Sequence, residues 1–161
     1  MSVPVSMPAH PAAEAAVADD PLEFQILNEI GIIAQLSQNR AGKILAPTLN
    51  MSQFAVLSHF SRLGGERSLV QLADNMQVTK AAMTNTVGRL RNKGLLDVQP
   101  DPSDGRGKRV TLTPAGRQAR DRAVAALGQA MAPLRQDFPS DEVAALLPGL
   151  RRLRVWFDAN R

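Results

Sequence analysis

The side chains best suited to chemistry with another molecule lie in the stretch DPSDGRGKRVTLTPAG, residues 101–116. It places Arg106, Lys108 and Arg109 among glycines, after residues that favour tight turns. Guanidinium and ammonium groups bind phosphate oxygens, and glycine lets a backbone approach a ligand without a Cβ clash. The two aspartates of the stretch are interpreted as turn-shaping residues rather than as a catalytic carboxylate pair. The stretch therefore predicts a polyanion site.

The distribution of charge along the chain supports this interpretation. The segment from Glu66 to Arg117 holds nine Lys and Arg residues against five Asp and Glu residues, whereas the remainder of the chain holds ten of each. The net charge of +4 therefore arises in about a third of the 161 residues. A local surplus of cations is the electrostatic footprint of nucleic-acid binding, although an ordinary solvated surface would also produce it.

A second group of polar side chains precedes this stretch, in TKAAMTNTVGRLRNKG, residues 79–94. Met83, Val87 and Leu90 recur at a spacing that turns one helix face inward, and the alternative to a binding face on the other side is a merely solvated one. Short polar side chains near a helix start suit base edges in the major groove, and longer cations suit phosphates. The residues predicted to contact DNA from this helix are Thr79, Lys80, Ala81, Thr84, Asn85, Arg89 and Lys93.

Helical periodicity supplies the elements that position this group. Apolar residues at helical spacing predict helices over about 21–44 and 52–63. SLVQLADNM predicts a short helix capped by Ser68, and Thr79 caps the next helix after a brief turn. Two short helices in close succession, the second with a polar face, are typical of a helix-turn-helix.

The basic stretch follows directly as the tip of a predicted β-hairpin. Alternation in LLDVQP and VTLT predicts two strands, and DPSDGRGKR connects them. Thr113 and Pro114 then start a helix that is expected to continue through Leu134, and a last helix is expected from Ser140. The apolar seam of that last helix steps by three and four residues and comprises Val143, Leu146, Leu150, Leu153 and Phe157. Such a seam suits a dimer interface or an intrachain core, and its place beside Trp156 at the chain end favours dimerisation.

The order of these elements predicts a mainly α fold with a small β-hairpin wing, a winged helix-turn-helix with flanking N- and C-terminal dimerisation helices. The predicted organisation is a disordered tail over 1–20, an N-terminal dimerisation helix over 21–48, a DNA-binding domain over 49–113 and C-terminal dimerisation helices over 114–161. The tail is rich in proline and alanine and has little to bury.

Several other kinds of chemistry find no support in the sequence. The chain has no cysteine, and His10 and His59 alone cannot form a metal centre. His59 is expected to be a satisfied, partly buried histidine or a packing residue. GRGKR is not a phosphate-binding P-loop, because an arginine and a strand follow its lysine. We therefore expect no enzyme, no catalytic residue, no metal and no cofactor. No secretory signal and no apolar run long enough for a membrane span is present, so a cytoplasmic protein is expected.

From about residue 49 to 117 the chain resembles the multiple-antibiotic-resistance regulator (MarR) family of bacterial transcription factors. The resemblance is carried by LNMSQFAVL, by LVQLADNMQVTKAAMTNTVGRLRNKGLL and above all by DPSDGRGKRVTLTPAG. It implies a homodimer with interdigitated first and last helices. It also implies that Arg106 enters the minor groove and that Asp104 orients it. Where the family often has a carboxylate that supports this arginine, the chain has Gly88.

These observations together predict a sequence-specific DNA-binding transcriptional regulator. The resemblance implies a ligand-responsive homodimeric repressor that binds a pseudo-palindromic operator in double-stranded DNA and responds to a small anionic or phenolic effector. The wing residues predicted to contact DNA are Asp104, Arg106, Lys108 and Arg109. The alternative is a winged helix used only for protein contacts. Such a module would have an apolar recognition face and a neutral wing, and this sequence has neither.

Overall fold

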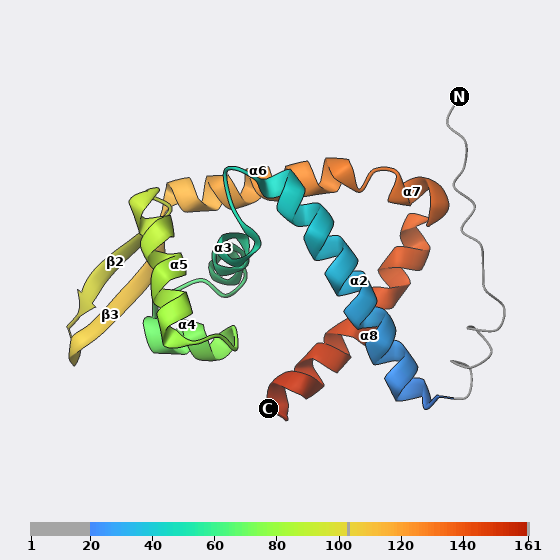
Figure 1. Cartoon of the computed structure of the whole chain (residues 1–161), viewed down its shortest axis with the longest axis horizontal. Coiled ribbons are helices and arrows are strands. Elements are labelled where there is room, and N and C mark those ends of the chain that lie inside the picture. Colours follow the sequence, from blue (N-terminus) through green and yellow to red (C-terminus); the bar gives the residue numbers. More distant parts are fainter. Residues whose placement is uncertain (1–19, 103, 161) are drawn as a thin grey trace. The chain divides into compact units, whose positions relative to one another are not determined.

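The computed structural model describes residues 20–102 and 104–160, without the side chains of residues 104–106. The chain divides into two compact units, and the boundary lies after Ala41. The helix α2 (Leu22–Leu45) runs through this boundary, and all other described elements belong to the second unit. Helices predominate, and a small antiparallel sheet is the other component, as predicted (Figure 1).

Helix α2 matches the predicted helix over 21–44 to within one residue at each end. Gln25 Nε2 donates a hydrogen bond of 2.7 Å to the carbonyl oxygen of Asp20, just before the helix. Glu23 in its first turn and Lys43 in its last turn each complement the helix dipole. Several of its large apolar side chains are exposed, among them Leu22, Phe24, Ile33 and Leu36.

The next three helices begin at short polar caps. Helix α3 (Met51–Leu63) follows Asn50, α4 (Leu69–Asn75) follows Ser68, and α5 (Lys80–Asn92) follows Thr79. Each cap side chain accepts a hydrogen bond from a backbone N–H of the first turn, which would otherwise lack a partner. Helices α4 and α5 contact each other and form the predicted helix-turn-helix.

The sheet contains one strand more than predicted. Strands β1 (Arg67–Ser68), β2 (Leu96–Asp101) and β3 (Asp104–Leu112) are antiparallel in the order β1-β3-β2. The two-residue β1 gives no alternation that sequence analysis could detect, because it exists only through its pairing with Val110 and Arg109 of β3.

The basic stretch is less of a loop than predicted. We expected DPSDGRGKR to connect two short strands, but β2 extends to Asp101 and β3 already begins at Asp104. The glycines at 105 and 107 therefore lie within β3, and Lys108 pairs with Pro100. Pairing along the hairpin overrides the low strand propensity of glycine. The backbone of Arg106 likewise belongs to β3 and not to a loop at the hairpin tip.

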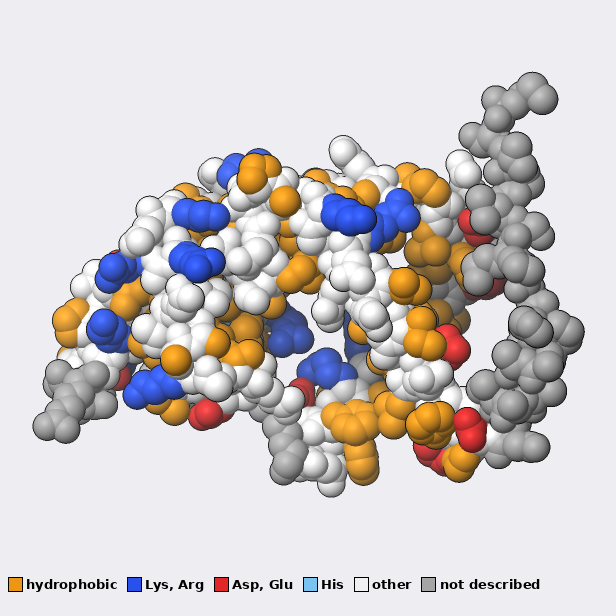
Figure 2. Space-filling model, viewed as in Figure 1, with side chains coloured by type: hydrophobic (Ala, Val, Ile, Leu, Met, Phe, Trp, Pro, Cys, Tyr) orange, Lys and Arg blue, Asp and Glu red, His pale blue; other side chains and the backbone are white. Residues whose placement is uncertain are grey.

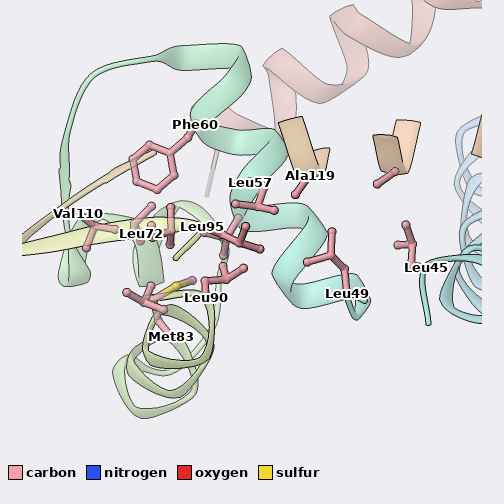
Figure 3. Packing of buried hydrophobic residues seen from close by; sticks show 14 of the residues in the cluster. Leu45, Leu49, Leu57, Phe60, Leu72, Met83, Leu90, Leu95, Val110 and Ala119 are labelled. Carbon is pink, nitrogen blue, oxygen red and sulfur yellow. The ribbon is translucent and has the colours of Figure 1, made fainter. Parts of the chain in front are cut away.

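One apolar core holds the helix-turn-helix and the sheet together. Figure 3 shows its side chains converging from α3, α4, α5, α6 and the sheet. The most deeply buried large side chains are Val56, Leu57, Phe60, Leu72, Leu90, Leu96 and Val110. Met83, Val87 and Leu90 all face inward from α5, as their spacing predicted. The opposite face of α5 is thereby turned outward.

The C-terminal part is broken once more than predicted. Helix α6 (Pro114–Ala130) has Thr113 as its cap and a proline in its first turn, as expected. It ends before Pro133 instead of continuing through Leu134, because proline offers no N–H and disfavours helical geometry in the preceding residue. A short α7 (Leu134–Asp137) and a long α8 (Ser140–Ala159) follow. No described helix is long and apolar enough to cross a bilayer.

Candidate nucleic-acid interface

The predicted recognition residues occupy exposed positions on α5 and its two caps. Thr79, Lys80, Ala81, Thr84, Asn85, Arg89 and Lys93 are all exposed. Met83 and Val87 on the inner face are at most 3% exposed, so the helix is firmly packed while its outer face is open. Helix α5 also lies against β2, so the sheet stands beside the recognition face (Figure 1). The structure therefore brings the predicted helix residues together as one surface.

The hydrogen bonds at the start of α5 determine which donors and acceptors its outer face can offer to another molecule. Thr79 Oγ1 accepts from the Ala82 N–H at 3.2 Å, which caps the helix. Thr84 Oγ1 donates to the Lys80 carbonyl oxygen at 2.7 Å. Because its hydroxyl hydrogen is used inside the helix, Thr84 presents acceptor lone pairs and a methyl group to its surroundings. Asn85 beside it offers an amide that can both donate and accept.

Lys93 has partners within the protein that the sequence did not indicate. Its Nζ donates to the Thr48 carbonyl oxygen at 2.6 Å and to Gln53 Oε1 at 3.3 Å. Gln53 is buried and forms the capping box of α3 with Asn50. The ammonium group thus connects the end of α5 to the start of α3. Phosphate binding by Lys93 stays a prediction, and it would compete with these bonds.

The wing cations differ in their surroundings. Lys108 is exposed on β3. Arg109 forms ion pairs with two carboxylates, from Nη1 to Glu66 Oε1 at 2.5 Å and from Nε to Asp101 Oδ1 at 3.1 Å. The hydrogen bonds donated to Glu66 and then to Asp101 raise the pKa of Arg109 above its ordinary value. The side chains of Asp104 and Arg106, whose roles came from the resemblance, lie outside the described residues.

Exposed cations lie on this surface, as they do on other parts of the molecule. Figure 2 shows Lys and Arg side chains over the part of the molecule that contains α4, α5 and the sheet. The exposed residues of this kind on the described parts of α5 and β3 are Lys80, Arg89, Arg91, Lys93 and Lys108. The outer face of α5 is therefore mainly polar and basic, unlike the apolar face that a protein-contact module would need.

His59 is buried and packs against its neighbours, as expected of a packing residue. Its side chain is 7% exposed and packs edge-on against Phe60. Its Nε2 has no hydrogen-bond partner among the described residues. Burial lowers the pKa of His59 below its usual value, and the charges of Arg62 and Arg67 lower it further. The described residues contain no cluster of three side chains suited to holding a metal.

A small cavity lies beside helix α6. It has a volume of about 230 Å³ and lies between the end of α2, the segment before α3 and α6. Its lining residues are Ile44, Leu45, Thr48, Leu49, Ala119, Arg122, Ala123 and Ala126. The lining is mostly apolar and contains one cation, Arg122, which suits a small molecule with one acidic group.

Comparison with known proteins identifies the fold. A model of the MarR family matches residues 48–107. The solved structure of the transcriptional regulator BldR from Sulfolobus solfataricus is 30% identical over 83% of this chain and 94% of that one, with a TM-score of 0.69. The chain belongs to the MarR family of transcriptional regulators. The resemblance stated from the sequence is thereby confirmed, and so is the winged-helix fold class.

Two further relatives add detail about this family. A MarR variant from E. coli complexed with operator DNA is 27% identical over 83% of this chain and 99% of that one, with a TM-score of 0.62. The transcriptional activatory protein BadR from Rhodopseudomonas palustris is 35% identical over 74 residues, which are 45% of this chain. The match spans 42% of the length of BadR.

Two residues that bond to candidate DNA-binding cations escaped sequence analysis. Glu66 follows two glycines at a predicted helix end, and Gln53 lies inside an amphipathic helix. Glu66 is 43 residues from its partner Arg109, and Gln53 is 40 residues from Lys93. No local signal in the sequence connects either pair.

Proposed function

We propose that this MarR-family regulator is a homodimeric repressor that binds a pseudo-palindromic operator in double-stranded DNA. The exposed polar and basic face of α5 is the observation that carries the proposal, and the helix itself lies against strand β2 of the wing. An α-helix fits the major groove of B-DNA, which is about 12 Å wide. The operator complex of the similar E. coli protein supports the same partner for this chain.

The proposed roles on DNA follow from side-chain type and position. Thr84 and Asn85 read base edges, and Ala81 permits close approach or contacts a thymine methyl group. Thr79 and Lys80 at the helix start, with Arg89 farther along, contact bases or phosphates at the rim of the groove. The wing contributes Lys108 to a phosphate and Arg106, supported by Asp104, to the minor groove.

Dimerisation is proposed through the helices that flank the DNA-binding domain. None of the residues 140–159 that form α8 is buried. The predicted seam includes Leu146 at 63% and Leu150 at 43% exposure. Exposed apolar seams of this length are unfavourable in water and become stable when buried against a second copy. The proposed domains remain 21–48 and 114–161 for dimerisation and 49–113 for DNA binding.

Repression is the proposed outcome for an operator that overlaps a promoter, since a bound dimer would exclude other proteins from that site. The name of BadR describes activation by a relative. A reporter gene placed behind the selected operator therefore tests whether this protein represses or activates transcription. Reporter output that falls when the protein is expressed supports repression. Output that rises contradicts it and leaves the DNA-binding proposal intact.

The cavity beside α6 is the proposed effector site. A volume of about 230 Å³ exceeds the roughly 150 Å³ that holds a benzene molecule in an engineered cavity, so a single-ring acid fits. Arg122 supplies the positive charge for its carboxylate. Titration with benzoate followed by calorimetry tests this proposal. Binding by the wild-type protein that Arg122→Gln abolishes supports it, whereas equal binding by both proteins places the ligand elsewhere.

Selection of bound sequences from a random DNA pool tests the proposed function directly. We expect inverted repeats with half-site centres about 10 base pairs apart, one helical turn, because a two-fold dimer presents two copies of α5. Affinity for the selected sites should fall steeply with salt, since bound cations release counterions from DNA. No affinity for any duplex at low salt would contradict the proposal.

A further inference from the structure

Arg109 lies at the centre of an ion-pair triad that joins all three strands of the sheet. Glu66 directly precedes β1, and Asp101 ends β2, while Arg109 belongs to the central strand β3. In the sheet register Arg109 faces Ser68 of β1 on one side and Gln99 of β2 on the other. Its guanidinium uses two different nitrogens to bind the two carboxylates.

The partners limit what Arg109 can offer to DNA. Its side chain is 33% exposed, and those of Asp101 and Glu66 are 15% and 50% exposed, so the Asp101 side of the triad is the more shielded from solvent. The guanidinium is already bound to two carboxylates. Arg109 is therefore less available to a phosphate group than the exposed Lys108 on the same strand. Arg109 was predicted from the sequence to contact DNA, and this environment supports a different role.

The triad lies beside β1, the strand with the fewest paired residues in the sheet. Strand β1 has only two residues paired with β3. Ser68 is also the N-cap of α4, so β1 leads directly into the first helix of the helix-turn-helix. A bridge from Glu66 through Arg109 to Asp101 adds a second connection between this point and the wing. An arginine fork suits such a bridge, because its nitrogens are rigidly spaced and bind two acceptors at once.

We infer that Arg109 is a positioning residue, which holds the wing at a set angle to α4 and α5 through Glu66 and Asp101 instead of binding a DNA phosphate. This inference rests on the proposed function, because the angle matters for DNA contacts by Lys108 and the rest of β3. It gives Glu66 and Asp101 a favourable effect on DNA binding despite their negative charge.

The direction in which one substitution changes operator affinity distinguishes the two roles. Glu66→Gln removes an anion near the DNA surface and keeps the size of the side chain. If Arg109 bound phosphate, this change would release it and tighten DNA binding. If Arg109 positions the wing, we expect operator affinity to fall about three- to tenfold with an unchanged salt slope. The matched control is Asp97→Asn, an exposed carboxylate on β2 that bonds to Gln99 and its own neighbour Val98. This control should bind operator as well as wild type or slightly better.

Rescue experiments on Arg109 provide the second readout. Arg109→Lys keeps the charge, but a single ammonium group cannot bridge both carboxylates with the same geometry. We expect Arg109→Lys to bind operator about as weakly as Arg109→Ala, although lysine would restore a phosphate contact. Full rescue by lysine, or tighter binding by Glu66→Gln, would overturn the inference.

Hydrogen exchange in the free protein makes the test independent of DNA. Amides of β1 and of the facing part of β3 should exchange about three- to tenfold faster in Glu66→Gln than in wild type, and at the wild-type rate in Asp97→Asn. Unchanged exchange in Glu66→Gln overturns the inference even if the protein binds its operator. Wild-type protein that binds no duplex contradicts the proposed function, while faster exchange would still support the connection between wing and α4.

Discussion

At the scale of single residues, close contacts decide which side chains the chain tolerates. The first turn of α6 packs against the end of α5 through Thr113, whose Oγ1 donates to the Gly94 carbonyl oxygen at 2.8 Å and accepts from the Gly116 N–H at 2.9 Å. A Cβ atom on Gly116 would lie 2.0 Å from the Leu95 carbonyl oxygen. Glycine at 116 is therefore required by packing against a backbone atom that cannot easily move.

We expect Gly116→Ala to lower the free energy of unfolding by about 2–4 kcal/mol, because the backbone of Leu95 must shift to relieve the clash. Urea denaturation measures this change. Gly128 in the same helix is the matched control, since a Cβ there would meet nothing within 4 Å. Gly128→Ala should raise stability by up to about 1 kcal/mol, because alanine favours helix. Similar losses in both variants would contradict the packing argument.

The proposed recognition of base sequence also depends on single side chains. We expect Asn85→Ala to relax preference at particular base pairs by roughly 1–3 kcal/mol, because its amide is proposed to pair with a base edge. Lys108→Ala should weaken binding to all sequences alike and reduce the salt slope by about one unit for each phosphate interaction removed. Competition binding with single-base operator variants distinguishes the two patterns. Uniform losses from both substitutions would remove Asn85 from the readout face.

At the scale of elements, the orientation of α5 depends on bonds at its far end. Lys93 connects it to the Thr48 carbonyl oxygen and to Gln53. As the C-cap residue of α5, Lys93 is placed favourably for that helix's dipole, although it lies close to the start of α3, where a positive charge is unfavourable. Its two hydrogen bonds offset this repulsion. Thr48 also lines the proposed effector cavity, so the same segment contacts both the cavity and the recognition helix.

The change Lys93→Ala should lower the free energy of unfolding by about 1 kcal/mol, because it removes two hydrogen bonds that connect α5 to α3 and the segment before it. Lys80→Ala at the exposed start of the same helix is the control, and it should change stability by less than about 0.5 kcal/mol. Thermal unfolding of both variants gives the comparison. If Lys93→Ala leaves stability unchanged and instead reduces the salt slope of DNA binding, its main role is a phosphate contact.

At the scale of the whole molecule, a single chain leaves large apolar side chains of α2 and α8 exposed to water. Leu146, Leu150 and Phe157 on α8 are each more than 40% exposed, and α2 exposes several large apolar side chains as well. A monomer would hold this surface in water at considerable cost. The proposed two-fold dimer would bury this surface and would also supply the two copies of α5 that an inverted-repeat operator needs.

Light scattering should therefore give about twice the chain mass of 17.4 kDa. The substitution Leu150→Asp should split the dimer, because a carboxylate cannot be buried without a partner. Ala144→Asp places the same group on α8 outside the seam and should leave the dimer intact. Wild-type protein that is monodisperse at the mass of one chain would contradict the dimer. Circular dichroism verifies that the variants remain folded.

Local features of the sequence were enough to predict most elements. Ser68, Thr79 and Thr113 were recognised as caps, because a cap needs only a short polar side chain and the N–H groups that follow it within three residues. The inward face of α5 followed from its helical spacing, since burial repeats with the helix period. The wing motif and the family resemblance rested on one continuous stretch of chain.

Only the tertiary structure decided how distant segments meet. Strand β1, the extension of β3 through the glycines, and the bonds of Arg109 and Lys93 each depend on pairing with residues outside their own segment of chain. The sequence by itself determined the caps, the amphipathic faces and the local surplus of charge, because these depend on neighbours within a few residues. It could not determine which cations already have partners, because an ion pair forms wherever folding brings opposite charges together, at any separation in the sequence.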